Sequence, residues 1–334
     1  MRSKYALPQN SVVTYLVLVT RIDSKGDVNA VRATAELPPP TPVSVLGLGQ
    51  LGSAVAAAFL AHGHPTTVWN RSARRASDLA ADGARVAADT VTAVESSPLV
   101  VVVVTDYAAA REVLRSAADS LAGRLVVNLA SGTPALAQEM AEWIGGLGAD
   151  YLDAAAMSGT RLVGDREALF LLSGSPQAFG VHQDTLEALG NAVHLGPDAG
   201  LASLFDTALF GLAWSALAGF YHAVALIGSA GVSANEVAAV ATGHLPFLAR
   251  LMTEHAEQIS TGEYPNHDGT VDVHAAAMGH FVETSRQHGV APDVPEFLKG
   301  LLDRAVALGY GHSGIAGVTE VIKQPVAQAA TPAS

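Results

Sequence analysis

Three glycines stand at a fixed spacing in the segment Gly47-Leu48-Gly49-Gln50-Leu51-Gly52. A β-branched run at 43–46 precedes this segment and an alanine-rich run follows it. In such a context the first glycine permits a tight turn from strand to helix, the second lets a phosphate approach the backbone, and the third lets the helix pack closely on the strand. A pyrophosphate then lies against the free N–H groups at the helix N-terminus. The segment therefore predicts a dinucleotide-binding site, in preference to an ordinary glycine turn.

The next predicted strand, at 66–69, ends on groups that bind phosphate. An acidic residue at this point holds the ribose 2′-hydroxyl of NAD, whereas a cationic group suits the 2′-phosphate of NADP. The chain has Asn70, Arg71 and Ser72 here, and Arg75 one helical turn later. Guanidinium groups pair well with phosphate oxygens. The alternative is a solvated basic helix start, which the helix dipole disfavours. We therefore expect NADPH as the cofactor.

Polar residues also follow two further predicted strands. Thr105 ends the β-branched run that begins at Leu99 and Asp106 begins the following loop, while the loop Ala130-Ser131-Gly132-Thr133 follows the run 125–129. Ligands of an open parallel sheet gather beyond the carboxyl ends of its strands. We expect this loop and Thr105 and Asp106 to bind the nicotinamide half of the cofactor. Helix capping is the alternative role for the serine, threonine and aspartate residues.

A single charge, Asp206, lies in the long apolar run 201–227. Because it comes just after the first domain, we expect it near the cleft between two domains. Burial without a basic partner raises the pKa of a carboxyl, so Asp206 can donate a proton or, when ionised, stabilise a cation. The alternative is an aspartate that only favours the helix dipole. No lysine occurs between Lys25 and Lys299, so a lysine cannot act at the start of this helix.

Aromatic residues follow Asp206 along the same predicted helix. Phe210, Trp214 and Tyr221 are candidates for a substrate pocket, and Phe210 and Trp214 fall on roughly the helical face of Asp206. A plain core role is the alternative for each. Met157, which follows the predicted strand 151–155, is a further pocket candidate.

Two domains of different architecture are needed to position these residues. Alternating strands and helices predict a Rossmann domain with a parallel sheet, and amphipathic periodicity predicts an all-α second domain. For the N-terminal segment 1–41 we expect a flexible extension, and the alternative is a secretion signal, although no small-residue cleavage site is present. The expected boundaries are 1–41 for a flexible extension, 42–199 for the NADP-binding domain, 200–230 for an interdomain helix, 231–325 for a helical dimerisation and substrate domain, and 326–334 for a tail.

Composition limits the classes of partner. A net charge of −12 over 334 residues disfavours nucleic acid and anionic membranes. The chain has no cysteine, which excludes disulfides, thiol catalysis and cysteine-based zinc sites and fits a cytoplasmic protein. The histidines at 267, 274 and 280 lack the spacing of a metal site. We expect a small-molecule substrate, no metal, no nucleic acid and no membrane.

The run 201–227 is long enough to span a membrane. No lysine or arginine flanks it to set an orientation, however, and a nucleotide-binding domain precedes it. A helix that is apolar on all sides is otherwise buried on every side. We therefore expect a partner subunit to surround this helix.

Five segments of the chain resemble the NADPH-dependent imine reductases of the β-hydroxyacid dehydrogenase superfamily, whose nucleotide domains are like that of 6-phosphogluconate dehydrogenase. The resemblance implies a Rossmann domain, a long interdomain helix and an all-α C-terminal domain that is exchanged between the protomers of a homodimer. The segments are 47–71, 126–134, 151–157, 204–226 and 303–311.

The resemblance also implies a reaction. Relatives that act on β-hydroxyacids carry a lysine near the start of the long helix, whereas imine reductases carry an aspartate or a tyrosine. The segment Leu204-Phe205-Asp206-Thr207-Ala208-Leu209 is similar to the aspartate type. NADPH then delivers a hydride to a cyclic imine or iminium ion, and Asp206 protonates the nitrogen or stabilises its charge.

Two positions depart from the family pattern. The loop Met157-Ser158-Gly159-Thr160 is closer to that of hydroxyacid dehydrogenases, and Ala218 stands where asparagine is expected. Both departures bear on the substrate range. Two alternatives to an imine reductase remain: a β-hydroxyacid dehydrogenase-like oxidoreductase that acts on another carbonyl or alcohol substrate, and a non-catalytic NADP-binding regulatory protein.

Overall fold

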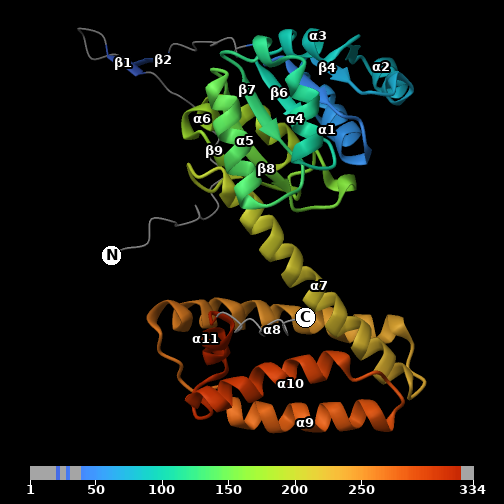
Figure 1. Cartoon of the computed structure of the whole chain (residues 1–334), viewed down its shortest axis with the longest axis vertical. Helices are drawn as coiled ribbons and strands as arrows, with labels where there is room; N and C mark the ends of the chain where they lie inside the picture. The colour runs from blue at the N-terminus through green and yellow to red at the C-terminus, as the bar shows by residue number, and fades with distance from the viewer. Residues whose placement is uncertain (1–19, 23–27, 31–38, 325–334) are drawn as a thin grey trace, which may run out of the picture. The chain divides into compact units, whose positions relative to one another are not determined.

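The computed structural model describes residues 20–22, 28–30 and 39–324. These residues form two compact units, 1–200 and 201–334, each of which is described by itself (Figure 1). Most of the predicted extension 1–41, and the whole tail 326–334, lie outside the described residues. Two short strands before residue 39, β1 (Thr20–Ile22) and β2 (Val28–Ala30), pair in antiparallel fashion.

An eight-stranded sheet forms the centre of the first unit, in the order β10-β9-β8-β7-β6-β3-β4-β5. All neighbouring strands are parallel except β8 and β9, which are antiparallel. The chain runs from β3 outward to β5, returns to β6 and runs outward the other way, so the order reverses between β3 and β6. The strands are β3 (Val43–Leu46), β4 (Thr66–Trp69), β5 (Arg85–Val86), β6 (Leu99–Val102), β7 (Leu125–Asn128), β8 (Asp150–Ala156), β9 (Leu169–Gly174) and β10 (Asn191–His194).

Helices cover both faces of this sheet. Because successive strand residues point to opposite faces, Val101 packs in one core cluster while Val100 and Val102 pack in the other. The first cluster includes residues of α1, α2 and α6, and the second includes residues of α3, α4 and α5. The helices are α1 (Gln50–Ala61), α2 (Ser77–Ala81), α3 (Thr90–Glu95), α4 (Tyr107–Arg115), α5 (Pro134–Gly146) and α6 (Pro176–Leu186).

The second unit consists of helices. Its two longest are α7 (Gly200–Gly228), whose first residue belongs to the first unit, and α8 (Ala234–Thr261). A capping box of Ser233 and Glu236 begins α8, and Gly262 in the left-handed conformation (φ 74°) ends it. The remaining helices are α9 (Val271–Gln287), α10 (Asp293–Ala305) and α11 (Val318–Ile322), and α9 and α10 lie side by side (Figure 1).

The apolar surface of α7 is largely exposed in the single chain. Within the part of the chain that the structure describes, α7 is the one helix long and apolar enough to cross a membrane, by length and composition. Only 6% of its most apolar 18-residue window is buried. An exposed apolar surface of this kind marks a site of interaction. The predicted architecture, a Rossmann domain followed by a long helix and an all-α domain, is confirmed.

Candidate cofactor and active site

A cavity of about 1060 Å³ opens in the first unit beyond the carboxyl ends of β3, β4, β6 and β7. It spans the point where the strand order reverses, which is where open α/β sheets bind their ligands. The predicted cofactor residues that line it are Gly47, Leu48, Gly49, Gln50, Leu51, Gly52, Asn70, Arg71, Ser72, Arg75, Thr105 and Ser131.

The three glycines of the turn each meet a different physical demand. Gly47 has φ +99°, and a Cβ there would lie 2.2 Å from the carbonyl oxygen of Val103. A Cβ at Gly52 would lie 2.0 Å from the carbonyl oxygen of Gly47, so the start of α1 packs directly on the turn. At Gly49, by contrast, no heavy atom lies within 4 Å of the Cβ position, and this residue faces the cavity. The turn is therefore closed on the protein side and open on the ligand side.

The start of α1 suits an anion. Gly49 is its N-cap, and no side chain caps this helix end in the described structure. The first N–H groups of a helix lack intrahelical partners and carry the positive end of the dipole. A bound phosphate would satisfy them without competition from a side chain.

Asn70 and Arg75 also hold the turn itself in place. The Asn70 Oδ1 accepts a hydrogen bond of 3.0 Å from the Leu48 N–H, and its Nδ2 donates to the carbonyl oxygen of Ser72 over 3.0 Å. Arg75 Nη1 donates to the carbonyl oxygen of Leu48 over 3.4 Å. Arg71 and Ser72 are exposed at the cavity. The side-chain amide of Asn70 is therefore committed to the loop, a role that the sequence did not suggest.

Two loops meet at the other end of the cavity. Asp106 and Ser131 form a parallel β-bridge, which ties the loop after β6 to the loop after β7. The Asp106 carboxylate accepts a hydrogen bond of 2.8 Å from the Ala109 N–H and caps α4, and Thr133 caps α5 by accepting from the Leu136 N–H. Capping thus describes what these two side chains do in the protein. A direct cofactor contact for Asp106, Ala130, Gly132 and Thr133, which do not line the cavity, stays a prediction.

Several residues that line the cavity were not singled out from the sequence. They come from the start of α3, from along α4 and its C-cap, and from strand ends: Trp69, Ala88, Asp89, Thr90, Val91, Val103, Val104, Ala109, Glu112, Val113, Ser116 and Leu129. Most are apolar or helix-capping residues without a motif. The available signal, a position at or just after a strand end, covers Trp69, Leu129 and the residues after β5 and β6, but not Glu112, Val113 and Ser116.

Asp206 lies on α7 in the second unit and is half-buried. Burial raises the pKa of its carboxyl above the usual range. The rings of Phe210 and Trp214 meet edge to face with centroids 6.2 Å apart, and both side chains, like that of Tyr221, are more than half exposed. Met157 follows β8 in the first unit. The meeting of Met157 with the α7 aromatics in one substrate pocket stays a prediction.

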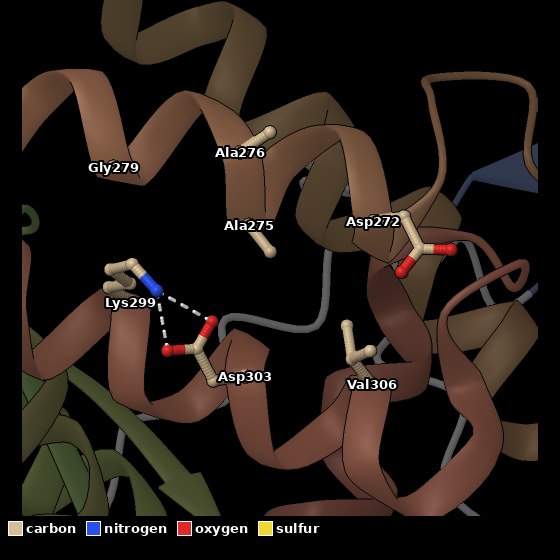
Figure 2. Close-up of a pocket in the computed structure, with 7 residues that line it drawn as sticks. All are labelled: Asp272, Ala275, Ala276, Gly279, Lys299, Asp303 and Val306. Atoms are coloured by element: carbon tan, nitrogen blue, oxygen red, sulfur yellow. Dashed lines mark hydrogen bonds and ion pairs between the residues drawn. The ribbon is translucent and has the colours of Figure 1, made fainter.

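A smaller cavity of about 330 Å³ lies between α9 and α10 (Figure 2). Lys299 and Asp303, one turn apart on α10, form an ion pair there, with Nζ 2.6 Å and 2.8 Å from the two carboxylate oxygens. The positive charge of Lys299 is thus neutralised by a residue of its own helix. Among the described residues no group of three or more His, Asp or Glu side chains could hold a metal ion.

Comparison with known proteins decides the family. Residues 198–324 match the NADPH-dependent reductive aminase-like C-terminal domain, and residues 42–196 match the NAD binding domain of 6-phosphogluconate dehydrogenase. The chain is 32% identical to the NADPH-dependent reductive aminase of Aspergillus oryzae over 84% of this chain and 97% of that protein. The chain belongs to the imine reductase and reductive aminase family.

Solved structures of imine reductases and reductive aminases agree with this assignment. The reductive aminase of Aspergillus terreus in complex with NADPH and ethyl levulinate is 35% identical, with a TM-score of 0.80 over 85% of this chain and 100% of that one. The Streptomyces aurantiacus imine reductase is 31% identical, with a TM-score of 0.81 over 85% and 100% of the two chains. The resemblance stated from the sequence is confirmed.

Proposed function

We propose that this imine reductase family member uses NADPH to reduce cyclic imines and iminium ions to amines. Two observations carry the proposal: Arg71, Ser72 and Arg75 line the cavity beside the glycine-rich turn, and the long helix has no lysine and Asp206 as its one charge. A lysine at the start of that helix would instead favour the β-hydroxyacid dehydrogenase alternative. The resemblance to reductive aminases over about 85% of the chain supports an enzyme rather than a non-catalytic NADP-binding regulatory protein.

The residues of the cavity fit NADPH along its length. The N-terminus of α1 would hold the pyrophosphate, because its N–H groups are uncapped and Gly49 leaves the space beside them open. Arg71, Ser72 and Arg75 would hold the 2′-phosphate. The loop of Ala130, Ser131, Gly132 and Thr133, with Thr105 and Asp106, would hold the nicotinamide half.

Asp206 would control the substrate nitrogen. When bound, NADPH would supply the hydride that reduces the carbon of the C=N bond, leaving the nitrogen to take up a proton. Because burial raises the pKa of Asp206, its carboxyl can stay protonated closer to neutral pH and give a proton to the imine nitrogen. With an iminium substrate, the ionised carboxylate would stabilise the positive nitrogen. Met157, Phe210, Trp214 and Tyr221 would supply apolar walls for the ring.

A substrate panel tests this function. Oxidation of NADPH is followed with 2-methyl-1-pyrroline, and reduction of NADP⁺ is followed with 3-hydroxyisobutyrate. We expect turnover of the imine and none of the hydroxyacid. Turnover of the hydroxyacid alone would support the dehydrogenase alternative, and NADPH binding without turnover over a broad imine panel and pH range would support the regulatory one.

We also propose a cytoplasmic homodimer with exchanged C-terminal domains, in which a second copy covers the apolar surface of α7. Support comes from the large apolar side chains exposed along this helix, such as Leu212 (47%) and Leu217 (41%). Fully burying a leucine side chain contributes about 1.5–3 kcal/mol, so covering the part of each leucine that is still exposed would contribute roughly 1 kcal/mol. The proposed boundaries are 42–199 for the cofactor domain, 200–230 for the connecting helix and 231–325 for the dimerisation domain.

The double variant Leu212→Asp, Leu217→Asp tests the dimer by light scattering on a sizing column. We expect it to dissociate or aggregate, while Val181→Asp, at an apolar position on α6 that is 79% exposed, keeps the mass of the wild type. A wild-type protein that is monomeric at micromolar concentration would refute the dimer.

A further inference from the structure

A carboxylate, Asp153, is buried in the sheet on β8, the neighbour of β7, and residues that follow β7 line the cofactor cavity. It is 1% exposed and is in register with Asn128 of β7. One of its oxygens, Oδ1, accepts hydrogen bonds from the hydroxyl of Tyr107 at 2.7 Å and from that of Tyr151 at 2.9 Å. The Asn128 Nδ2 donates to the same oxygen at 3.4 Å. We call these four residues the Asp153 network.

The donors of the Asp153 network suit an ionised carboxylate. A charged oxygen can accept several hydrogen bonds at once, and such charge-assisted bonds are the stronger ones. Burial, and after it the charge of Asp153, raise the pKa of Tyr151 well above its usual range, so this phenol stays protonated and donates a hydrogen bond. A buried carboxylate that lost its donors would be strongly unfavourable. We therefore expect the three donors to hold Asp153 in place.

Two connections lead from Asp153 to the loop 130–133. The first passes through Asn128, whose Oδ1 accepts a hydrogen bond of 3.3 Å from the Ala130 N–H. The second passes through Tyr107, whose ring lies so close to Gly132 that a Cβ there would be 2.4 Å from the ring. Tyr151, by contrast, donates from the same strand as Asp153. Removal of its hydroxyl takes a donor from the carboxylate and leaves both connections to the loop in place.

This loop lies at a defined end of the cavity. The 2′-phosphate donors follow β4, on one side of the strand-order reversal, while β6 and β7 lie on the other side. The two halves of a dinucleotide extend to opposite sides of that reversal. Ser131 lines the cavity and is bridged to Asp106. The loop that the Asp153 network holds therefore belongs to the half of the cavity remote from the 2′-phosphate.

We propose that Asp153, Tyr107 and Asn128 are positioning residues that fix the loop 130–133 for the nicotinamide half of the cofactor. The proposal rests on the NADPH-dependent function proposed above. It adds residues that touch neither the cofactor nor the substrate and that act through Ala130 and Gly132. A specific consequence of the proposal is that the Asp153 network contributes to binding of the nicotinamide half of the dinucleotide and not of the half that carries the 2′-phosphate.

Two ligands that differ only in the nicotinamide separate this role from a general structural one. Dissociation constants are measured by titration calorimetry for NADPH and for 2′-phospho-ADP-ribose, which keeps the adenine, the phosphates and both riboses. For Tyr107→Phe, which removes a hydrogen bond to a charged oxygen, and for Asp153→Asn, which removes the negative charge that the three donors face, we expect NADPH affinity to fall about tenfold or more. The affinity for 2′-phospho-ADP-ribose should stay within about twofold, since each variant leaves the phosphate-binding turn unchanged.

Tyr151→Phe is the matched control. It also removes a phenol that donates to Asp153 Oδ1, and we expect its ratio of the two dissociation constants to equal that of the wild type. Equal ratios in Tyr107→Phe and the wild type would overturn the proposal, as would equal losses of affinity for both ligands. If Asp153→Asn does not fold, Tyr107→Phe decides the question alone, because it keeps the ring against Gly132. A wild type that binds neither ligand would instead refute the proposed function.

Discussion

Replacement of Gly49 by alanine should separate cofactor binding from folding. Gly49 has φ −71° and ψ −169°, an extended conformation that alanine adopts readily. No heavy atom lies within 4 Å of the position of the new methyl group. Alanine at an N-cap is less favourable than glycine, at a cost of up to about 1 kcal/mol. We therefore expect Gly49→Ala to fold with nearly the stability of the wild type.

The same methyl group should strongly weaken NADPH binding. It projects into the side of the turn that faces the cavity, where the pyrophosphate must approach the first N–H groups of α1. A hydrogen bond to a charged group contributes about 1.5–3 kcal/mol. Loss of one such bond would weaken binding by about tenfold to 150-fold, because every 1.4 kcal/mol is about a factor of ten.

Calorimetry can measure both quantities, with NADPH titrated into the protein and thermal unfolding followed without ligand. The matched control is Gly145→Ala on α5, which also has open space around its Cβ position but does not line the cavity. The control should bind NADPH like the wild type and gain up to about 1 kcal/mol of stability from the better helix former. Wild-type affinity in Gly49→Ala would refute the placement of the pyrophosphate. A large decrease in the melting temperature of Gly49→Ala would refute the claim that there is space for a methyl group at Gly49.

Other substitutions address the cofactor's phosphate and the substrate's nitrogen. The double variant Arg71→Ala, Arg75→Ala should raise KM for NADPH by about tenfold to 1000-fold, because charged hydrogen bonds are lost, and should change KM for NADH far less. Equal changes of KM for the two cofactors in steady-state assays would contradict the assignment of these arginines to the 2′-phosphate. Asp206→Asn should lower kcat by about 100-fold or more with a neutral imine. In the wild type, kcat should fall as pH rises through the raised pKa of Asp206. An unchanged kcat in the variant would remove Asp206 from the mechanism. Because the folded state binds this proton more tightly than the unfolded state, the contribution of Asp206 to stability is present in full below its ordinary pKa of 3.8 and is lost as pH rises through the raised value. The Asp206→Asn variant should therefore have a higher melting temperature than the wild type at neutral pH, and this difference should disappear in acid. A lower melting temperature of the variant at pH 7 would contradict the predicted direction of the effect.

Local features of this chain could be predicted from its sequence. The turn at Gly47, the uncapped start of α1 and the arginines after β4 depend on residues close together in the chain, and their roles follow from backbone geometry. The end of β6 was harder to predict. The β-branched run continues to Thr105, but the strand ends at Val102, because its partner β3 ends at Leu46 and the chain turns away at Gly47.

The Asp153 network could not be predicted, because it depends on long-range register. Tyr107 and Asp153 are 46 positions apart, and they meet only because β8 pairs with β7 so that Asp153 stands beside Asn128. A shift of one residue in that pairing would turn the carboxylate to the other face of the sheet. For the same reason the contribution of α3 and α4 to the cavity wall was not foreseen: no motif marks residues that become neighbours through the order of the strands.

The cavity wall takes its positive charge from Arg71 and Arg75 and contains no lysine. A primary amine condenses with ketones and aldehydes to form a Schiff base, whereas the guanidinium group stays protonated. An enzyme of this family that meets a carbonyl compound together with a free amine would thus offer no competing amine at the cofactor site. The absence of lysine between Lys25 and Lys299 therefore leaves residues 42–199 without a lysine amine that a carbonyl compound could capture. Carbonyl adducts of the described residues would be confined to Lys299 and Lys323, on the helical unit.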